Sequence, residues 1–117
     1  MRGQKINKSP VQKLAESLNL NIRNPSSLNQ NEEELKYFKS LTTDIVVVVA
    51  YGQVIPKEFL ILSKHGFINI HASLLPKWRG AAPIQRAIMN LDEVTGISVM
   101  KIVEKLDYGP TMFKKEI

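Results

Sequence analysis

Residues 44–50 read Asp-Ile-Val-Val-Val-Val-Ala, with an unbroken row of β-branched side chains between Asp44 and Ala50. β-Branched residues favour extended backbone, because the two heavy atoms on Cβ restrict the side chain beside a helical turn. A continuous apolar row is typical of a strand that is buried on both faces, as in a parallel sheet covered by helices. The stretch therefore predicts an α/β fold.

Helix and strand signals alternate around this strand. Ser9 before Pro10, and Asn31 before a run of glutamates, are typical helix starts, since their side chains accept free backbone N–H groups. Apolar spacing, glycines and prolines predict helices at 10–19, 31–41, 56–63 and 84–90. They also predict strands at 67–71, 96–103 and 111–117, and a very short one at Ile22. We expect a Rossmann-like, mainly parallel sheet with flanking helices.

The two ends of this pattern are open. No strand signal precedes Pro10, and the chain stops inside the last predicted strand. A parallel sheet normally begins with a strand, so residues 1–117 are expected to form a partial domain that lacks an N-terminal β-α-β portion. A C-terminal portion is expected to be missing as well.

Composition excludes several classes of protein. The chain has 117 residues, 44% of them hydrophobic, and no cysteine, so disulfides and thiolate metal sites are excluded. No apolar run approaches the roughly 18 residues that a membrane helix needs. The basic residues Arg2, Lys5 and Lys8 are not followed by an apolar segment, so no signal peptide is predicted. The sequence favours a soluble, cytoplasmic protein.

Positive charge gathers in two places. The formal net charge is +5, and residues 1–13 contain basic residues but no acid. A second cluster consists of Lys77, Arg79 and Arg86. Such clusters favour a polyanionic partner such as nucleic acid. Charge alone leaves open a second interpretation, in which scattered lysines keep a small protein in solution.

Two polar side chains lie at the end of the strand predicted at 67–71. Residues two apart on a strand point to the same face, so Asn69 and His71 are expected to project together while Ile70 faces the core. Ligands of open α/β sheets bind outside the carboxyl ends of the strands, which is where this pair lies. The alternative is that His71 is a structural residue whose ring is simply hydrogen-bonded.

The loop predicted at 72–82 could line a ligand site. Its small residues allow a close approach of the backbone to a ligand. Leu74 and Leu75 lie outside any regular element and could wall an apolar pocket. The alternative is a loop that packs on its own leucines.

A later carboxylate, Asp107, could complete the site. It precedes Gly109-Pro110, and an aspartate in such a turn often bonds only nearby backbone amides. It also follows the strand at 96–103, so we expect it at the same sheet edge as His71. A histidine, a carboxylate and an amide donor can together serve acyl transfer.

The run Phe-Ile-Asn-Ile-His-Ala-Ser-Leu-Leu-Pro-Lys-Trp-Arg-Gly-Ala-Ala-Pro-Ile-Gln-Arg-Ala-Ile at 67–88 resembles the signature of the folate-dependent formyltransferases. Further matches lie at 46–52 and 95–100, in Arg2-Gly-Gln-Lys5, and in Ser9-Pro-Val11. They cover essentially the whole chain in one order, which is far more specific than a constellation of a few residues. The resemblance implies the formyltransferase fold, followed in the complete family members by a C-terminal barrel domain that this chain lacks.

The resemblance also implies an activity and its residues. The implied reaction transfers a formyl group from 10-formyltetrahydrofolate to the α-amino group of initiator methionyl-tRNA, without a metal, in a protein expected to be a monomer. The implied catalytic residues are Asn69, His71 and Asp107. The residues implied to bind the folate are Ser73, Leu74, Leu75 and Pro76. The residues implied to approach the tRNA acceptor end are Arg2 and Lys5.

Two alternatives stay open. The formyl acceptor could be another amine, on a sugar nucleotide or on glycinamide ribonucleotide, although the basic loop at 2–8 favours tRNA. The chain could also be an inactive remnant that still binds folate or RNA.

Overall fold

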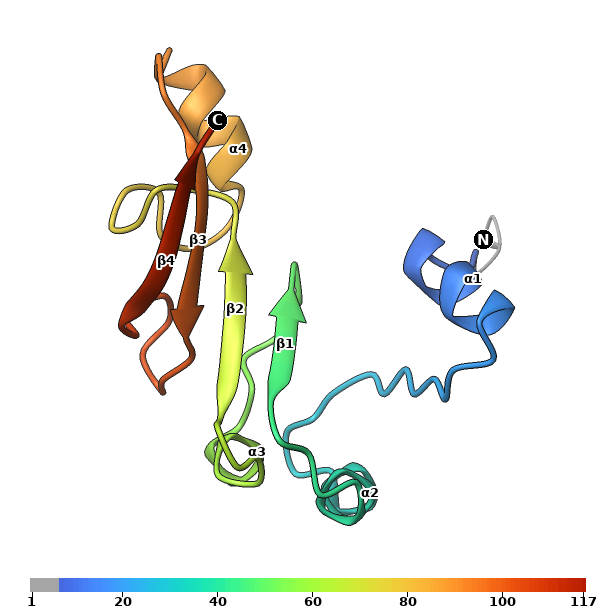
Figure 1. Ribbon diagram of the computed structural model, residues 1–117. Helices are drawn as coiled ribbons and strands as arrows, with labels where there is room; N and C mark the ends of the chain where they lie inside the picture. Colours follow the sequence, from blue (N-terminus) through green and yellow to red (C-terminus); the bar gives the residue numbers. More distant parts are fainter. Residues whose placement is uncertain (1–6) are drawn as a thin grey trace, which may run out of the picture.

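A computed structural model of the chain describes residues 7–117. Its centre is a four-stranded sheet in the order β1-β2-β3-β4 (Figure 1). The strands are β1 (Val46–Val49), β2 (Phe67–His71), β3 (Gly96–Lys101) and β4 (Thr111–Glu116). The helices are α1 (Pro10–Ser17), α2 (Glu32–Ser40), α3 (Lys57–Leu60) and α4 (Pro83–Met89).

Every predicted helix and strand is present except the short strand at Ile22, where the prediction is wrong. Residues 21–25 form neither helix nor strand. An isolated apolar residue between Asn21 and Arg23 has no neighbouring strand with which to pair its backbone. An extended backbone would therefore make no hydrogen bonds of a sheet there.

The sheet of the described strands is mixed rather than mainly parallel. β1 and β2 run parallel and are joined through α3, which makes the β-α-β unit of an α/β fold and confirms the predicted class. The β2–β3 and β3–β4 pairs are antiparallel. The reason is the place of α4, which lies beyond the end of β2 rather than along the sheet (Figure 1). The chain therefore re-enters the sheet from the end that it has just left.

Side-chain caps begin the two longer helices, as the sequence predicts. The Ser9 hydroxyl accepts a hydrogen bond from the Gln12 N–H at 3.1 Å at the start of α1. The Asn31 side chain accepts one from the Glu34 N–H at 3.1 Å at the start of α2. Each cap satisfies a backbone donor that has no partner inside the helix and stabilises it by about 1 kcal/mol.

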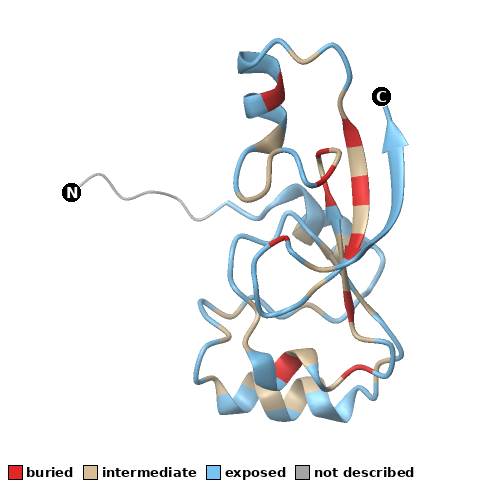
Figure 2. Cartoon of the chain, turned by 90° about the vertical axis from the view of Figure 1, so that its left-hand side faces the viewer, coloured by how far each residue is buried: buried red, intermediate tan, exposed pale blue. Residues whose placement is uncertain are grey.

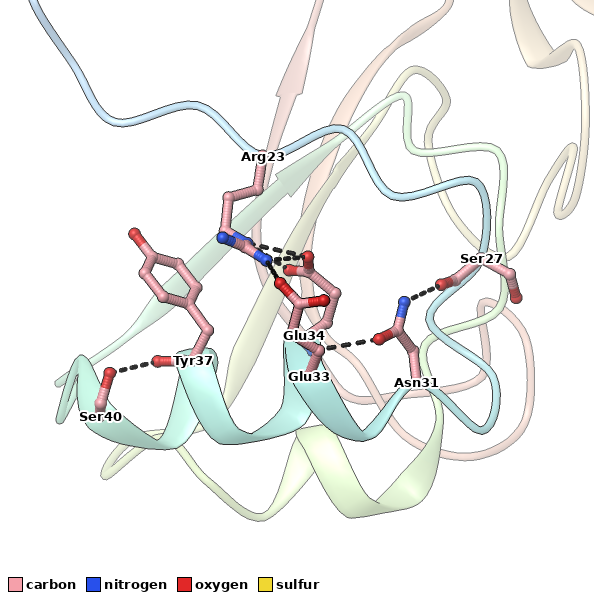
Figure 3. A network of polar contacts seen from close by, with 7 residues as sticks. All are labelled: Arg23, Ser27, Asn31, Glu33, Glu34, Tyr37 and Ser40. Atoms are coloured by element: carbon pink, nitrogen blue, oxygen red, sulfur yellow. Dashed lines mark hydrogen bonds and ion pairs between the residues drawn. The ribbon is translucent and has the colours of Figure 1, made fainter.

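An ion-pair cluster fastens the segment before α2 to that helix (Figure 3). The Arg23 guanidinium contacts Glu34 at 2.6 Å and Glu33 at 2.8 Å. It also lies over the ring of Tyr37, 4.4 Å from the ring centroid. Hydrogen bonds and the positive charge of Arg23 lower the pKa of the Glu34 carboxyl below its ordinary value. The cluster orients the chain between α1 and α2 and contributes no group to the strand ends.

The two faces of the sheet differ in burial. Along β3 buried residues alternate with half-buried ones (Figure 2). On the covered face, Phe67 of β2 stacks on Phe38 of α2 at 5.7 Å between ring centroids, and Phe59 of α3 meets Phe38 at 5.8 Å. These rings form the main apolar contact between the helices and the sheet.

The other sheet face is open, which corrects two expectations. Val47 and Val49 are 55% and 60% exposed, so β1 is not buried on both faces. Ile70 lies on this open face and not in the core, because Phe67 and His71 take the covered face of β2. The aromatic contacts of α2 and α3 lie on the covered side of the sheet. None of the helices in residues 7–117 is long and apolar enough to cross a membrane.

Candidate active site

His71 ends β2 with its side chain on the covered face of the sheet, where it is buried. Its ring atom Nε2 lies 2.9 Å from the backbone oxygen of Trp78, in the loop that follows the strand. A carbonyl oxygen only accepts hydrogen bonds, so Nε2 carries the proton in this contact. The other ring nitrogen, Nδ1, lies 3.9 Å from Oδ2 of Asp107. The ring is held from one side and presents Nδ1 to a carboxylate on the other.

Asp107 is also buried, although it lies in the loop between β3 and β4. Its Oδ2 accepts a hydrogen bond from the Gly80 N–H at 2.7 Å, and its backbone oxygen accepts one from Arg79 Nε at 2.8 Å. Its φ of 51° lies in the left-handed region, which few residues other than glycine adopt. These contacts hold that conformation and tie the loop after β3 to the loop after β2.

The route by which Asp107 reaches His71 differs from the expected one. Because β3 runs antiparallel to β2, the carboxyl ends of the two strands lie at opposite edges of the sheet. Residues 102–110 fold back along β3, and the Lys101 N–H donates to the Pro110 oxygen at 3.0 Å. A Cβ on Gly109 would lie 1.7 Å from the Lys101 oxygen, so only glycine fits this return. The Asp107 carboxylate is therefore brought to His71 by the folded-back loop and not by the end of β3.

Asn69 lies on the same face of β2 as His71 and opposite Met100 of β3, which is almost fully buried. Together with Asp107 it lines a cavity between the segment after β1 and the segment after β3. The other lining residues are Val48, Tyr51, Gln53, Val54, Ile55, Met100, Ile102, Val103, Glu104 and Leu106. The structure thus brings the three predicted catalytic residues to one place beside a hollow.

Residues 51–55, which form one wall of this cavity, were not predicted to be part of the site. A signal for them was present. β1 runs parallel to β2, so their carboxyl ends lie at the same sheet edge, and Gly52 marks the end of β1. The rule that singled out Asn69 and His71 therefore applies equally to the residues that follow β1.

The residues predicted to bind folate have different environments. Ser73 is fully buried, and its hydroxyl donates to the Lys77 oxygen at 2.6 Å. Leu75 is buried as well, and its N–H donates to the Ser98 hydroxyl at 2.9 Å. Leu74 is half-buried and Pro76 is exposed. The Ser73 and Leu75 side chains point inward and shape the loop, so they could influence a ligand only through the backbone.

A buried carboxylate outside the predicted site, Asp92, organises the same loop. Its oxygens accept hydrogen bonds from Trp78 Nε1 at 2.6 Å and from Lys77 Nζ at 2.7 Å. A third bond comes from Asn90 Nδ2 at 2.6 Å. The Lys77 ammonium, followed by Asn90 and Trp78, lowers the pKa of Asp92 to about 2. No sequence motif singled out this residue.

The two residues predicted to contact tRNA, Arg2 and Lys5, lie outside the described residues. Within residues 7–117, no cluster of three or more histidine, aspartate or glutamate side chains is arranged to hold a metal ion.

The chain belongs to a known family. The model of the formyl transferase family matches residues 1–117. The chain is 69% identical over 109 residues to the methionyl-tRNA formyltransferase of Pelagibacter ubique, a match that covers 93% of the chain and 35% of that protein. It is 51% identical over 116 residues to the methionyl-tRNA formyltransferase of Caulobacter vibrioides, covering 99% of the chain and 37% of that protein. The chain thus spans little more than a third of these relatives.

A solved structure gives the same fold. The phosphoribosylglycinamide formyltransferase of Bacillus halodurans superposes with a TM-score of 0.82 at 24% identity, over 96% of this chain and 61% of that one. At this identity the likeness concerns the fold alone. The family resemblance that the 67–88 signature indicated is confirmed.

Proposed function

We propose that the protein transfers a formyl group from 10-formyltetrahydrofolate to the α-amino group of initiator methionyl-tRNA. One observation carries the proposal: His71 and Asp107 are buried side by side next to Asn69, in a chain that is 69% identical to a methionyl-tRNA formyltransferase. Because the chain spans about a third of that relative, the activity is proposed for the whole protein.

The proposed chemistry needs three roles. The Asn69 amide N–H would donate to the formyl oxygen as negative charge develops there, and one such donor can be worth roughly 3 kcal/mol of barrier. His71 offers Nδ1, since its Nε2 proton is engaged by the Trp78 carbonyl. As the amine nitrogen bonds to the formyl carbon, a neutral Nδ1 accepts the proton that the amine loses, and the protonated Nδ1 stabilises the oxygen. The bond between the formyl carbon and folate N10 then breaks, and N10 takes up that proton as the leaving group. Asp107, 3.9 Å from Nδ1, would hold the ring in this orientation.

The cavity beside Asn69 is the proposed place of the folate ring. The formyl carbon must come within reach of Asn69 and Asp107, and these two residues line the cavity. Its walls combine aliphatic side chains with the exposed polar residue Gln53, as ligand sites for flat heteroaromatic rings require. The predicted Ser73–Pro76 contribution is then indirect, because these residues set the course of the loop that carries Trp78.

The proposed acceptor is tRNA rather than a smaller amine. The chain carries a formal net charge of +5, and Arg2 and Lys5 are proposed to approach the acceptor end of the tRNA. We further propose a monomeric, cytoplasmic enzyme without a membrane partner.

The test is an acceptor comparison with the full-length protein. Formyl transfer from 10-formyltetrahydrofolate is measured with methionyl-tRNA, glycinamide ribonucleotide and an amino-sugar nucleotide. We expect kcat/KM to be highest for methionyl-tRNA by several orders of magnitude and to fall as salt concentration rises, because phosphate contacts are screened. A higher kcat/KM for either small acceptor would refute the assignment of tRNA. Binding of folate without transfer to any acceptor would identify an inactive remnant.

A further inference from the structure

The carbonyl that holds His71 belongs to a residue in an unfavourable conformation. Trp78 has a φ of 57°, in the left-handed region, where a bulky side chain crowds the backbone. Such a conformation is costly and persists only where the surroundings over-determine it. It is this conformation that presents the Trp78 carbonyl to Nε2 of His71 at 2.9 Å. The position of His71 therefore depends on what holds Trp78.

Asp92 is the group that holds it. The Asp92 side chain is only 4% exposed, and its Oδ2 accepts a hydrogen bond from the Trp78 indole N–H at 2.6 Å. Asp92 is itself anchored, because its backbone N–H donates to the Ala87 oxygen of α4 at 3.0 Å. A charged acceptor bonded to a neutral donor makes one of the stronger hydrogen bonds in proteins. The carboxylate thus connects the rigid end of α4 to the indole.

We propose that Asp92 is a positioning residue for His71. By fixing the Trp78 indole it fixes the Trp78 carbonyl, which keeps the His71 proton on Nε2 and leaves Nδ1 facing Asp107. The effect on catalysis rests on the proposed formyl transfer, whereas the effect on the histidine proton does not.

The competing explanation is that Asp92 only neutralises Lys77 and caps the segment after α4. The Lys77 side chain is 52% exposed, and an exposed ion pair contributes little to stability. The two explanations differ in one respect. Only the proposal requires that the indole N–H, and not merely the carboxylate, matters for His71.

A double-mutant cycle in the full-length protein distinguishes the two explanations for Asp92. Trp78→Phe keeps an aromatic ring but removes the N–H, and Asp92→Ala removes the acceptor. We expect each variant to lower kcat by about 10- to 100-fold, with KM for the folate changed much less, because a small displacement of a catalytic group has effects of this size. The double variant should lose no more than the worse single variant, because both changes break the same link. Asn90→Ala, which removes another Asp92 bond but does not touch Trp78, is the control and should keep kcat.

¹⁵N NMR of the His71 ring shows directly which nitrogen carries the proton. The His71 signals are assigned as those that disappear in the His71→Asn variant. We expect the Nε2–H form to predominate in the unmodified protein and a rise of the Nδ1–H form in Trp78→Phe. This readout decides the proposal even if Asp92→Ala fails to fold, and even if the protein transfers no formyl group. An unchanged ring signal in Trp78→Phe, or additive losses of kcat in the double variant, would overturn it.

Discussion

The two ring nitrogens of His71 have different neighbours, and this difference limits what the residue can do. Nε2 faces an obligate acceptor, the Trp78 oxygen, and Nδ1 faces the carboxylate of Asp107. The sequence predicted that a histidine and a carboxylate would meet, because each follows a predicted strand and the family resemblance implies both as catalytic residues. It could not predict which nitrogen would be free, since that depends on a backbone carbonyl placed by the unusual conformation of Trp78.

Asp107→Asn tests the charge at this position with little change of shape. The asparagine oxygen can still accept from the Gly80 N–H, so we expect the fold to survive. Loss of the negative charge beside Nδ1 should lower kcat by about 100-fold or more, the usual contribution of a positioned acid–base group. His71→Ala should lower it by at least as much. Steady-state kinetics with methionyl-tRNA, and circular dichroism for the fold, provide the measurements. Near-normal turnover in either variant contradicts the assignment.

At the scale of elements, the loop between β3 and β4 depends on Gly109. A Cβ at this position would overlap the Lys101 oxygen of β3. We expect Gly109→Ala to push the loop off the strand, at a cost of about 1–3 kcal/mol in unfolding free energy, and to move Asp107 away from His71. The free energy of unfolding, measured with denaturant, and kcat should therefore both fall.

The matched control for that loop is Gly52→Ala, measured for stability only. A Cβ on Gly52 would meet no heavy atom within 4 Å, so its unfolding free energy should stay close to that of the unmodified protein. Where alanine fits without strain, replacing glycine lowers the entropy of the unfolded chain and stabilises the fold slightly. Equal losses of stability in the two variants would therefore contradict a cost that arises from the close approach of Gly109 to β3.

The link between α4 and the loop after β2 should be sensitive to acid. The pKa of Asp92 is lowered from 3.8 to about 2 by Lys77, Asn90 and Trp78. A carboxyl with a lowered folded-state pKa stabilises the fold fully above its unfolded value and loses that effect as the pH falls toward the folded value. Between about pH 4 and pH 2, Asp92→Asn should therefore lose less stability than the unmodified chain. Parallel curves of melting temperature against pH would contradict this.

Local signals predicted the elements better than their arrangement. Ser9 and Asn31 cap the helices that they were expected to start, and β2 has the bounds read from the sequence. The direction of β3 was not predictable from its own residues, because α4 forms at the same place in the sequence whether it crosses the sheet or stays at its end. The contact between Asp92 and Trp78 was not predicted for a similar reason, because it joins separate segments through tertiary packing.

At the scale of the whole molecule, an apolar sheet face is exposed. Val47 and Val49 of β1 and Ile70 of β2 lie on it. Phe113 of β4, which is 56% exposed, lies in the same row, because it pairs with Val99, the partner of Ile70. The valine row correctly predicted a strand, but burial on its second face requires a covering layer that residues 7–117 do not supply. Exposed apolar area of this kind makes no stabilising contacts within the chain. It favours association with other molecules or partial unfolding.

This exposed face leads to a prediction for the 117-residue chain on its own. We expect weak or absent formyl transfer and strong binding of a hydrophobic dye, because β1, whose end carries one wall of the cavity beside Asn69, is covered on one side only. Val47→Lys together with Val49→Lys should reduce dye binding without restoring activity, since both side chains point away from His71. Rates of the isolated chain equal to those of the full-length protein would contradict the argument. They would mean that the geometry around His71 and Asp107 is maintained by the described contacts alone, however bare the opposite face of the sheet is.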